Sequence, residues 1–173
     1  MRKSSPVRAF LAILIVLLFA GCIADGPPML RARAETQEVE ESPNYPGLTL
    51  RGTLSVTGDK LTITTLATNA GNWTYKVESV CGGPWTVELF QGDERREMQK
   101  PQTQCRAFEL ADFGPNASLS FVTDWDGMVW DPDLKRQVDA LPGDYEWSVR
   151  FVAYHPDGMQ LKRLDLDFDV TVA

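Results

Sequence analysis

Residues 164–172 read LDLDFDVTV, and this stretch decides the fold class. Apolar side chains occupy every second position, and aspartates stand at 165, 167 and 169. A period of two is the pattern of a half-buried β-strand, because successive side chains point to opposite faces of a sheet. We expect the three aspartates to form a solvated face that discourages aggregation between strand edges. A cation site on the same face is the alternative.

The same alternation recurs upstream, and turn residues interrupt it at short intervals. We expect strands over residues 48–56, 61–67, 73–77, 85–89, 108–110, 119–125, 145–153 and 164–172. Turn residues separate them, such as Thr57-Gly58-Asp59 and Pro142-Gly143-Asp144. No part of the chain after residue 48 has a period of 3.6. The pattern predicts an all-β fold: an immunoglobulin-like antiparallel β-sandwich of about seven or eight strands over residues 48–173.

The first 21 residues have the organisation of a secretory signal. Arg2, Lys3 and Arg8 precede a run of twelve apolar residues, AFLAILIVLLFA, at positions 9–20. Such a helix would rise about 18 Å, less than the roughly 30 Å of a hydrocarbon core. We therefore predict a signal peptide over residues 1–21, with an uncleaved short membrane anchor as the alternative.

The residues after the apolar run add a second feature. Phe19-Ala20-Gly21-Cys22 resembles the lipobox of bacterial lipoproteins. The resemblance implies that Cys22 is lipidated and becomes the N-terminus, which places the chain in the bacterial cell envelope, outside the cytoplasm and held to the membrane by acyl chains. Cleavage before Cys22 would remove three of the 17 basic side chains and none of the 24 acidic ones, lowering the net charge from −7 to −10.

Residues 22–47 carry four prolines and an acidic cluster. No strand or helix period persists across them. We expect a lipidated N-terminus followed by a flexible linker over 22–47, with a short helix over 31–41 as the alternative.

The other two cysteines, Cys81 and Cys105, are expected to pair, because the predicted compartment is oxidising. Both stand twelve residues from Asp93, where we expect a hairpin to turn. A bridge at the base of that hairpin would contribute roughly 3 kcal/mol. The alternative is a catalytic thiol, for which His155 is the single histidine in the sequence.

Composition and motifs argue against several classes of function. A net charge of −7 disfavours nucleic-acid binding. The sequence contains no nucleophile elbow, phosphate loop, CxxC or HExxH motif. Asp124-Trp125-Asp126-Gly127 matches only part of a calcium loop. We therefore expect no enzyme activity, no cofactor and no metal site.

Two tryptophans are the candidate binding residues. Trp130 lies in residues 127–144, which we expect to be the least regular part of the domain. A tryptophan in a long loop either covers the sandwich or anchors a partner. Trp125 or Trp130 would also serve to stack on a sugar ring.

Several turns and strands occur in the order found in one known family. Asn69, Gly114-Pro115-Asn116, Trp125 and Pro142-Gly143-Asp144-Tyr145 follow one another in this order. In this the chain resembles the BsuPI-type proteinase inhibitor family over residues 48–173. The resemblance implies an immunoglobulin-like β-sandwich and a proteinase as one class of partner. We expect a membrane-anchored lipoprotein that binds a protein partner; the alternative is a carbohydrate or cell-wall binding module.

Overall fold

The computed structural model describes residues 29–40, 47–99, 107–156 and 161–173. All regular structure in these residues is β, with no helix. The strands are β1 Leu30–Ala32, β2 Glu35–Glu40, β3 Leu48–Thr57, β4 Lys60–Asn69, β5 Tyr75–Glu78, β6 Trp85–Gln91, β7 Glu94–Arg96, β8 Leu110–Phe113, β9 Ser118–Trp125, β10 Met128–Asp131, β11 Arg136–Asp139, β12 Gly143–Tyr154 and β13 Leu161–Val172.

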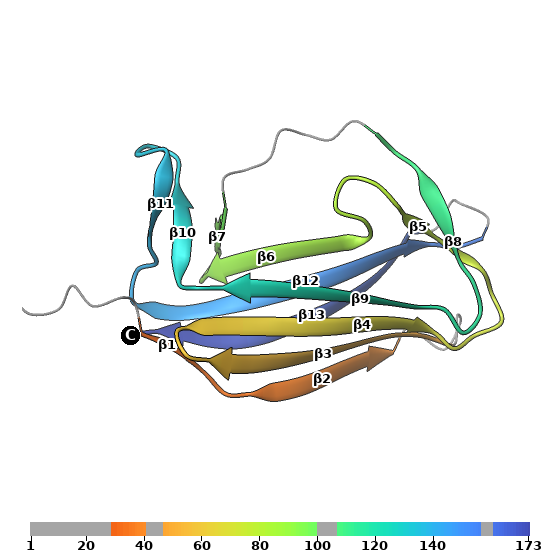
Figure 1. Cartoon of the computed structure of the whole chain (residues 1–173), viewed down its shortest axis with the longest axis horizontal. Coiled ribbons are helices and arrows are strands. Elements are labelled where there is room, and N and C mark those ends of the chain that lie inside the picture. The colour runs from red at the N-terminus through yellow and green to blue at the C-terminus, as the bar shows by residue number, and fades with distance from the viewer. Residues whose placement is uncertain (1–28, 41–46, 100–106, 157–160) are drawn as a thin grey trace, which may run out of the picture.

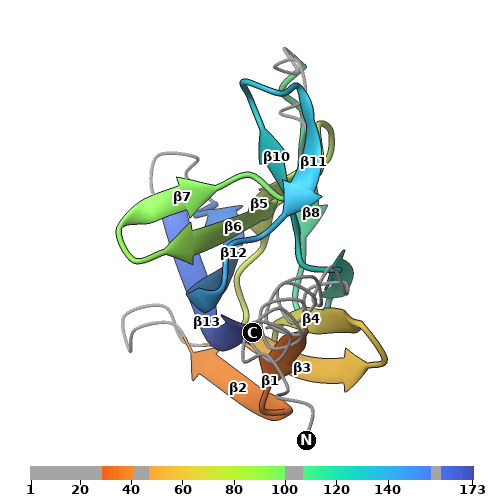
Figure 2. The ribbon, with the colours of Figure 1, turned by 90° about the vertical axis from the view of Figure 1, so that its left-hand side faces the viewer.

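The strands form an antiparallel β-sandwich, as predicted (Figure 1). One sheet has seven strands in the order β1-β13-β12-β5-β8, and β6 also pairs with β12 and with β7. The other has four strands in the order β2-β3-β4-β9. Strands β10 and β11 form a separate two-stranded hairpin that projects from one end of the sandwich (Figures 1 and 2).

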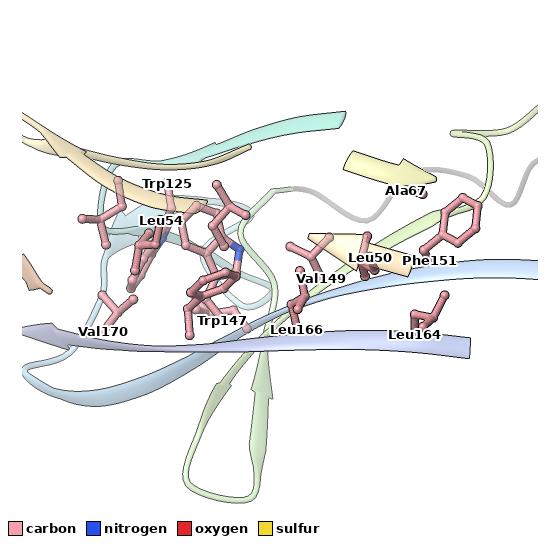
Figure 3. Close-up of a cluster of buried hydrophobic side chains, with 14 of the residues drawn as sticks. Leu50, Leu54, Ala67, Trp125, Trp147, Val149, Phe151, Leu164, Leu166 and Val170 are labelled. Carbon is pink, nitrogen blue, oxygen red and sulfur yellow. The ribbon is translucent and has the colours of Figure 1, made fainter. Parts of the chain in front are cut away.

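The core lies between the two sheets and uses the alternation seen in the sequence. In the long β12–β13 ladder, Trp147 faces Phe168 and Val149 faces Leu166, and all four side chains are buried. Leu50 and Leu54 of β3 are buried from the opposite sheet (Figure 3). Removing this apolar surface from water is the main stabilising contribution to the fold.

The aspartates of β13 lie on the outer face, away from the core. Asp165 accepts a hydrogen bond from Nε of Arg150 at 2.5 Å, across the β12–β13 ladder. Nη1 of the same arginine lies 3.4 Å from Glu88 of β6. Among the described residues, no group of three or more His, Cys, Asp or Glu side chains is placed to hold a metal ion.

A tyrosine corner stabilises the start of β12. The hydroxyl of Tyr145 donates to the carbonyl oxygen of Leu141 at 2.8 Å. This contact is a hallmark of immunoglobulin-like sandwiches, where it fixes the turn that leads into a central strand. It explains why Leu141-Pro-Gly-Asp-Tyr145 opens a strand in this chain.

The expectation of a flexible linker over all of 22–47 is wrong for part of that range. Leu30 and Ala32 of β1 pair with β13, and residues 35–40 of β2 pair with β3. Leu30 is buried in the core, and Gln37 donates from Nε2 to the carbonyl oxygen of Asp167 at 2.7 Å. Backbone hydrogen bonds to two existing sheet edges order these residues, despite their polar composition.

The strand count is also higher than about seven or eight. All eight predicted strands are present, with bounds shifted by a few residues. The additional ones are β1, β2, β7, β10 and β11. The residues of the predicted signal peptide lie outside the described part of the chain. Within the described ranges, no helix is long and apolar enough to cross a membrane.

Candidate functional site

The β10–β11 hairpin is the most distinctive local feature of the molecule, and its turns explain why it forms. Oδ1 of Asp126 accepts from the backbone N–H of Met128 at 3.2 Å, next to Gly127, whose φ is 80°. At the tip, Oδ1 of Asp131 accepts from the N–H groups of Asp133 and Leu134 at 2.8 and 2.9 Å. These aspartates are therefore turn-forming residues. Residues 127–144, which were expected to be the least regular part of the domain, contain two short paired strands, because such turns support them.

The hairpin is attached to the chain that follows β7. The N–H of Trp130 donates to the carbonyl oxygen of Glu97 at 2.6 Å. Nε2 of Gln137 donates to the carbonyl oxygen of Met98 at 3.0 Å. At its base, the N–H of Ala140 donates to Gly127 at 2.8 Å. The first two bonds join the hairpin to the segment that follows β7, and the third closes the base of the hairpin.

A groove of about 280 Å³ runs between the hairpin and the β6–β7 hairpin, beside the start of β12. Its size and its mixed apolar and polar lining suit part of a ligand. We call it the hairpin groove. It is lined by Gln91, Arg96, Val129, Trp130, Asp131, Pro132, Asp133, Val138, Asp139, Leu141 and Tyr145.

The two candidate tryptophans have different positions. Trp130 lines the groove and is partly exposed. Trp125 is 2% exposed, so its nomination as a binding residue is wrong: the core covers the ring on which a sugar or partner would have to stack. Its Nε1 donates to the carbonyl oxygen of Met128 at 2.9 Å, and its ring lies 5.4 Å from that of Tyr145. Trp125 therefore supports both the hairpin base and a wall of the groove.

Arg96 carries the positive charge of the groove. Its Nη2 lies 2.7 Å from Oε2 of Glu94 and donates to Oε1 of Gln91 at 3.1 Å. Its Nε is buried and has no hydrogen-bond partner in the described residues. Burial raises the pKa of Tyr145, whereas Arg96 and the hydrogen bond to Leu141 lower it, and burial dominates. The phenol therefore stays neutral at physiological pH.

The residues proposed for an alternative thiol chemistry do not form a catalytic pair. Cys81 is disulfide-bonded, so its sulfur is no free nucleophile. The ring of His155 lies 5.6 Å from that of Trp73, and His155 follows Tyr154 at the end of β12 that lies away from the hairpin.

The surroundings of Cys81 bear on its predicted pairing. Its Sγ lies 3.1 Å from the carbonyl oxygen of Ala107, a contact rather than a hydrogen bond, because a disulfide sulfur carries no proton. This contact extends the β5–β8 ladder, in which Glu78 pairs with Leu110. The expected hairpin does turn at Gly92-Asp93, where Gln91 faces Glu94. Cys105 and Cys22 lie outside the described residues, so their pairing and lipidation stay predictions.

Sequence reasoning missed Gln91, Arg96 and Tyr145 as groove residues. Gln91 and Arg96 flank the predicted turn at Asp93, and Tyr145 follows the predicted turn at Gly143. No pattern in the sequence indicates that these two turns and Trp130 meet at one end of the sandwich.

The comparisons with known proteins do not identify a function for the chain. No protein-family model matches the chain, and no curated protein matches it. Among solved structures, it is similar to a protein from Bordetella pertussis assigned as ApaA, with 10% identity, a TM-score of 0.33, and coverage of 84% of this chain and 94% of that one. It is also similar to a β-glucosidase from Kluyveromyces marxianus, with 15% identity, a TM-score of 0.32, and coverage of 79% of this chain and 15% of that one. Likenesses this distant assign no function to the chain.

Proposed function

We propose that this chain is a bacterial envelope lipoprotein whose β-sandwich binds a partner protein in the hairpin groove, without catalysis. The lipid on Cys22 would keep it at the membrane, and the groove would provide specificity. The chain would need no cofactor for this role.

The observation that carries the proposal is the composition of the groove. Trp130 and Tyr145 contribute aromatic surface, and Arg96 contributes a guanidinium with an unpaired buried Nε. Tryptophan, tyrosine and arginine are the residue types that dominate the energetic centres of protein interfaces. The groove brings all three together on elements fixed by backbone hydrogen bonds.

A matched pair of tryptophan variants tests this use of the groove. Full-length protein in detergent is immobilised and exposed to envelope extract, and each captured protein is then titrated as a purified species. We expect Trp130→Ala to weaken binding of the specific partner by at least about tenfold, since truncating an interface centre costs 1–2 kcal/mol or more. Trp73→Ala is the control, because Trp73 is 50% exposed and lies at the other end of the sandwich.

The proposal fails if every captured protein binds the Trp130→Ala variant as tightly as wild type. Anchoring is tested separately. Cys22→Ser should move the protein out of the membrane fraction; unchanged fractionation would refute lipidation at Cys22.

A glycan is the second candidate ligand, and the groove lining supports it. Trp130 offers a ring for stacking, and Gln91 and Asp139 offer an amide and a carboxylate that can bond sugar hydroxyls. Peptidoglycan fragments should then shift the tryptophan fluorescence of wild type and not that of Trp130→Ala. No shift in wild type would remove this candidate.

The resemblance to BsuPI-type inhibitors makes proteinases a partner class to assay directly. If the partner is a proteinase, adding the full-length protein should lower cleavage of a casein substrate by envelope extract, and Trp130→Ala should restore it. Unchanged cleavage with wild type would leave a binding role without inhibition.

A further inference from the structure

The structure places the point where the chain leaves toward Cys22 at the same end of the sandwich as the hairpin groove. Leu30 of β1 pairs with Val172, and Val172 pairs with Gly143 on its other side. The N–H of Ala173 donates to the carbonyl oxygen of Met29 at 3.0 Å. Leu141, which lines the groove, stands two residues before Gly143. We call this the anchor end; it faces the viewer in Figure 2.

The length of chain between Cys22 and the sandwich is short. Residues 22–28 precede the first described residue, Met29. Fully extended, they span at most about 25 Å. Strand β13 has twelve residues and runs from the far end to the anchor end, a distance of about 40 Å. Residues 22–28 are therefore too short to reach along the whole sandwich. The far end alone cannot lie on the membrane while Cys22 is anchored there.

The anchor end also carries apolar side chains next to the exit point. Met29 is 59% exposed and Leu141 is 63% exposed. Met29 directly precedes β1 and Leu141 stands just before β12. The end of β13 lies between these two strand ends. Because the chain is acidic, attraction to anionic headgroups contributes little to membrane binding. Apolar contact and the lipid on Cys22 would have to keep this end at the bilayer.

We propose that the anchor end lies on the bilayer surface, with Met29 and Leu141 at headgroup level, so that the hairpin groove meets its partner at the membrane. The inference rests on the proposed lipid attachment at Cys22. It makes the partner of the groove a membrane-bound protein, because the groove stays within reach of the bilayer.

Fluorescence quenching in vesicles tests this orientation. The full-length lipidated protein is reconstituted into phosphatidylcholine vesicles that contain a spin-labelled headgroup lipid as quencher. One variant, Leu141→Cys, carries an environment-sensitive fluorophore at the anchor end. The matched variant, Ser118→Cys, carries it at the start of β9, at the far end, where the substitution is nearly isosteric. Labelling is done without reduction, and wild type treated in the same way gives the background.

We expect the label at position 141 to lose most of its fluorescence and the label at 118 to lose little. Equal quenching, which a sandwich lying on its side would give, would overturn the proposal, as would stronger quenching at 118. A Cys22→Ser protein separates the two proposals. If wild type and Cys22→Ser bind vesicles equally poorly, the lipid attachment fails; if wild type alone binds and the labels are quenched equally, only the orientation fails.

Discussion

Asn69 shows how one buried side chain organises an end of the sandwich. It is fully buried, and its Nδ2 donates to the carbonyl oxygens of Trp73 and Phe113 at 2.7 and 2.9 Å. Its Oδ1 accepts from the N–H of Gly71 at 3.2 Å. The side chain thereby connects the end of β4, the turn that follows, and the end of β8.

Replacing Asn69 with alanine should lower the free energy of unfolding by about 2–3 kcal/mol, because the buried carbonyl of Phe113 and the partly buried carbonyl of Trp73 lose their donor. Urea titration of the full-length protein measures this. The control is Asn72→Ala, an exposed asparagine in the same turn, which should change stability by less than about 0.5 kcal/mol. Equal losses for both variants would contradict this role of Asn69.

Gly52 marks a limit of prediction at the residue scale. It falls at an inward position of β3, between Leu50 and Leu54, where the alternation calls for an apolar side chain. A Cβ at this position would lie 2.6 Å from Cδ1 of Leu166 and 3.2 Å from Cζ of Phe168. The space is filled from the opposite sheet, and the sequence of β3 alone carries no sign of this.

At the scale of elements, the long strands were predictable and the short ones were not. Strands β3, β4, β12 and β13 each have ten or twelve residues, so their period of two is unmistakable. The four residues of β10 read Met-Val-Trp-Asp, three apolar residues in a row without alternation, and the four of β11 offer one apolar side chain, Val138, amid polar neighbours. Pairing partners, rather than their own side chains, make these segments strands, and partners are not visible in a local pattern.

The hairpin should depend on Trp125, although this residue is buried and does not line the hairpin groove. Trp125→Phe removes the donor to Met128, which we expect to cost about 1 kcal/mol and to loosen the hairpin base. Hydrogen exchange should then be faster at the amides of Trp130 and Ala140, and partner affinity should fall. Trp85→Phe is the comparison, since Trp85 stacks on Phe121 at 5.3 Å, away from the hairpin. Unchanged exchange in Trp125→Phe would contradict the supporting role.

For the whole molecule, the raised pKa of Tyr145 links stability to alkaline pH. Burial favours the neutral phenol in the folded state, so its contribution is present below the ordinary tyrosine pKa of 10.0 and is lost as the pH rises through the higher folded value. At pH 7, Tyr145→Phe should lower stability by about 1 kcal/mol through loss of the tyrosine corner. The difference between wild type and variant should narrow above pH 10. A constant difference from pH 7 to 11 would show that the pKa is not raised.

The whole-molecule arrangement could be predicted in outline. Alternation and turn residues give the two-layer sandwich, because burial of one face per sheet leaves few other solutions. They do not give the site. Gln91, Arg96, Trp130 and Tyr145 come from four strands, and the crossing of those strands at one end depends on the order of strands in the sheets.

The proposed role of the molecule depends on its partner binding in the hairpin groove. Site-specific photocrosslinking in cells tests it most directly, with a benzophenone amino acid in place of Trp130 in one strain and in place of Trp73 in another. We expect one crosslinked adduct of defined mass from position 130, in the membrane fraction, and none from position 73. Adducts of the same mass from position 73, with none from position 130, would contradict it.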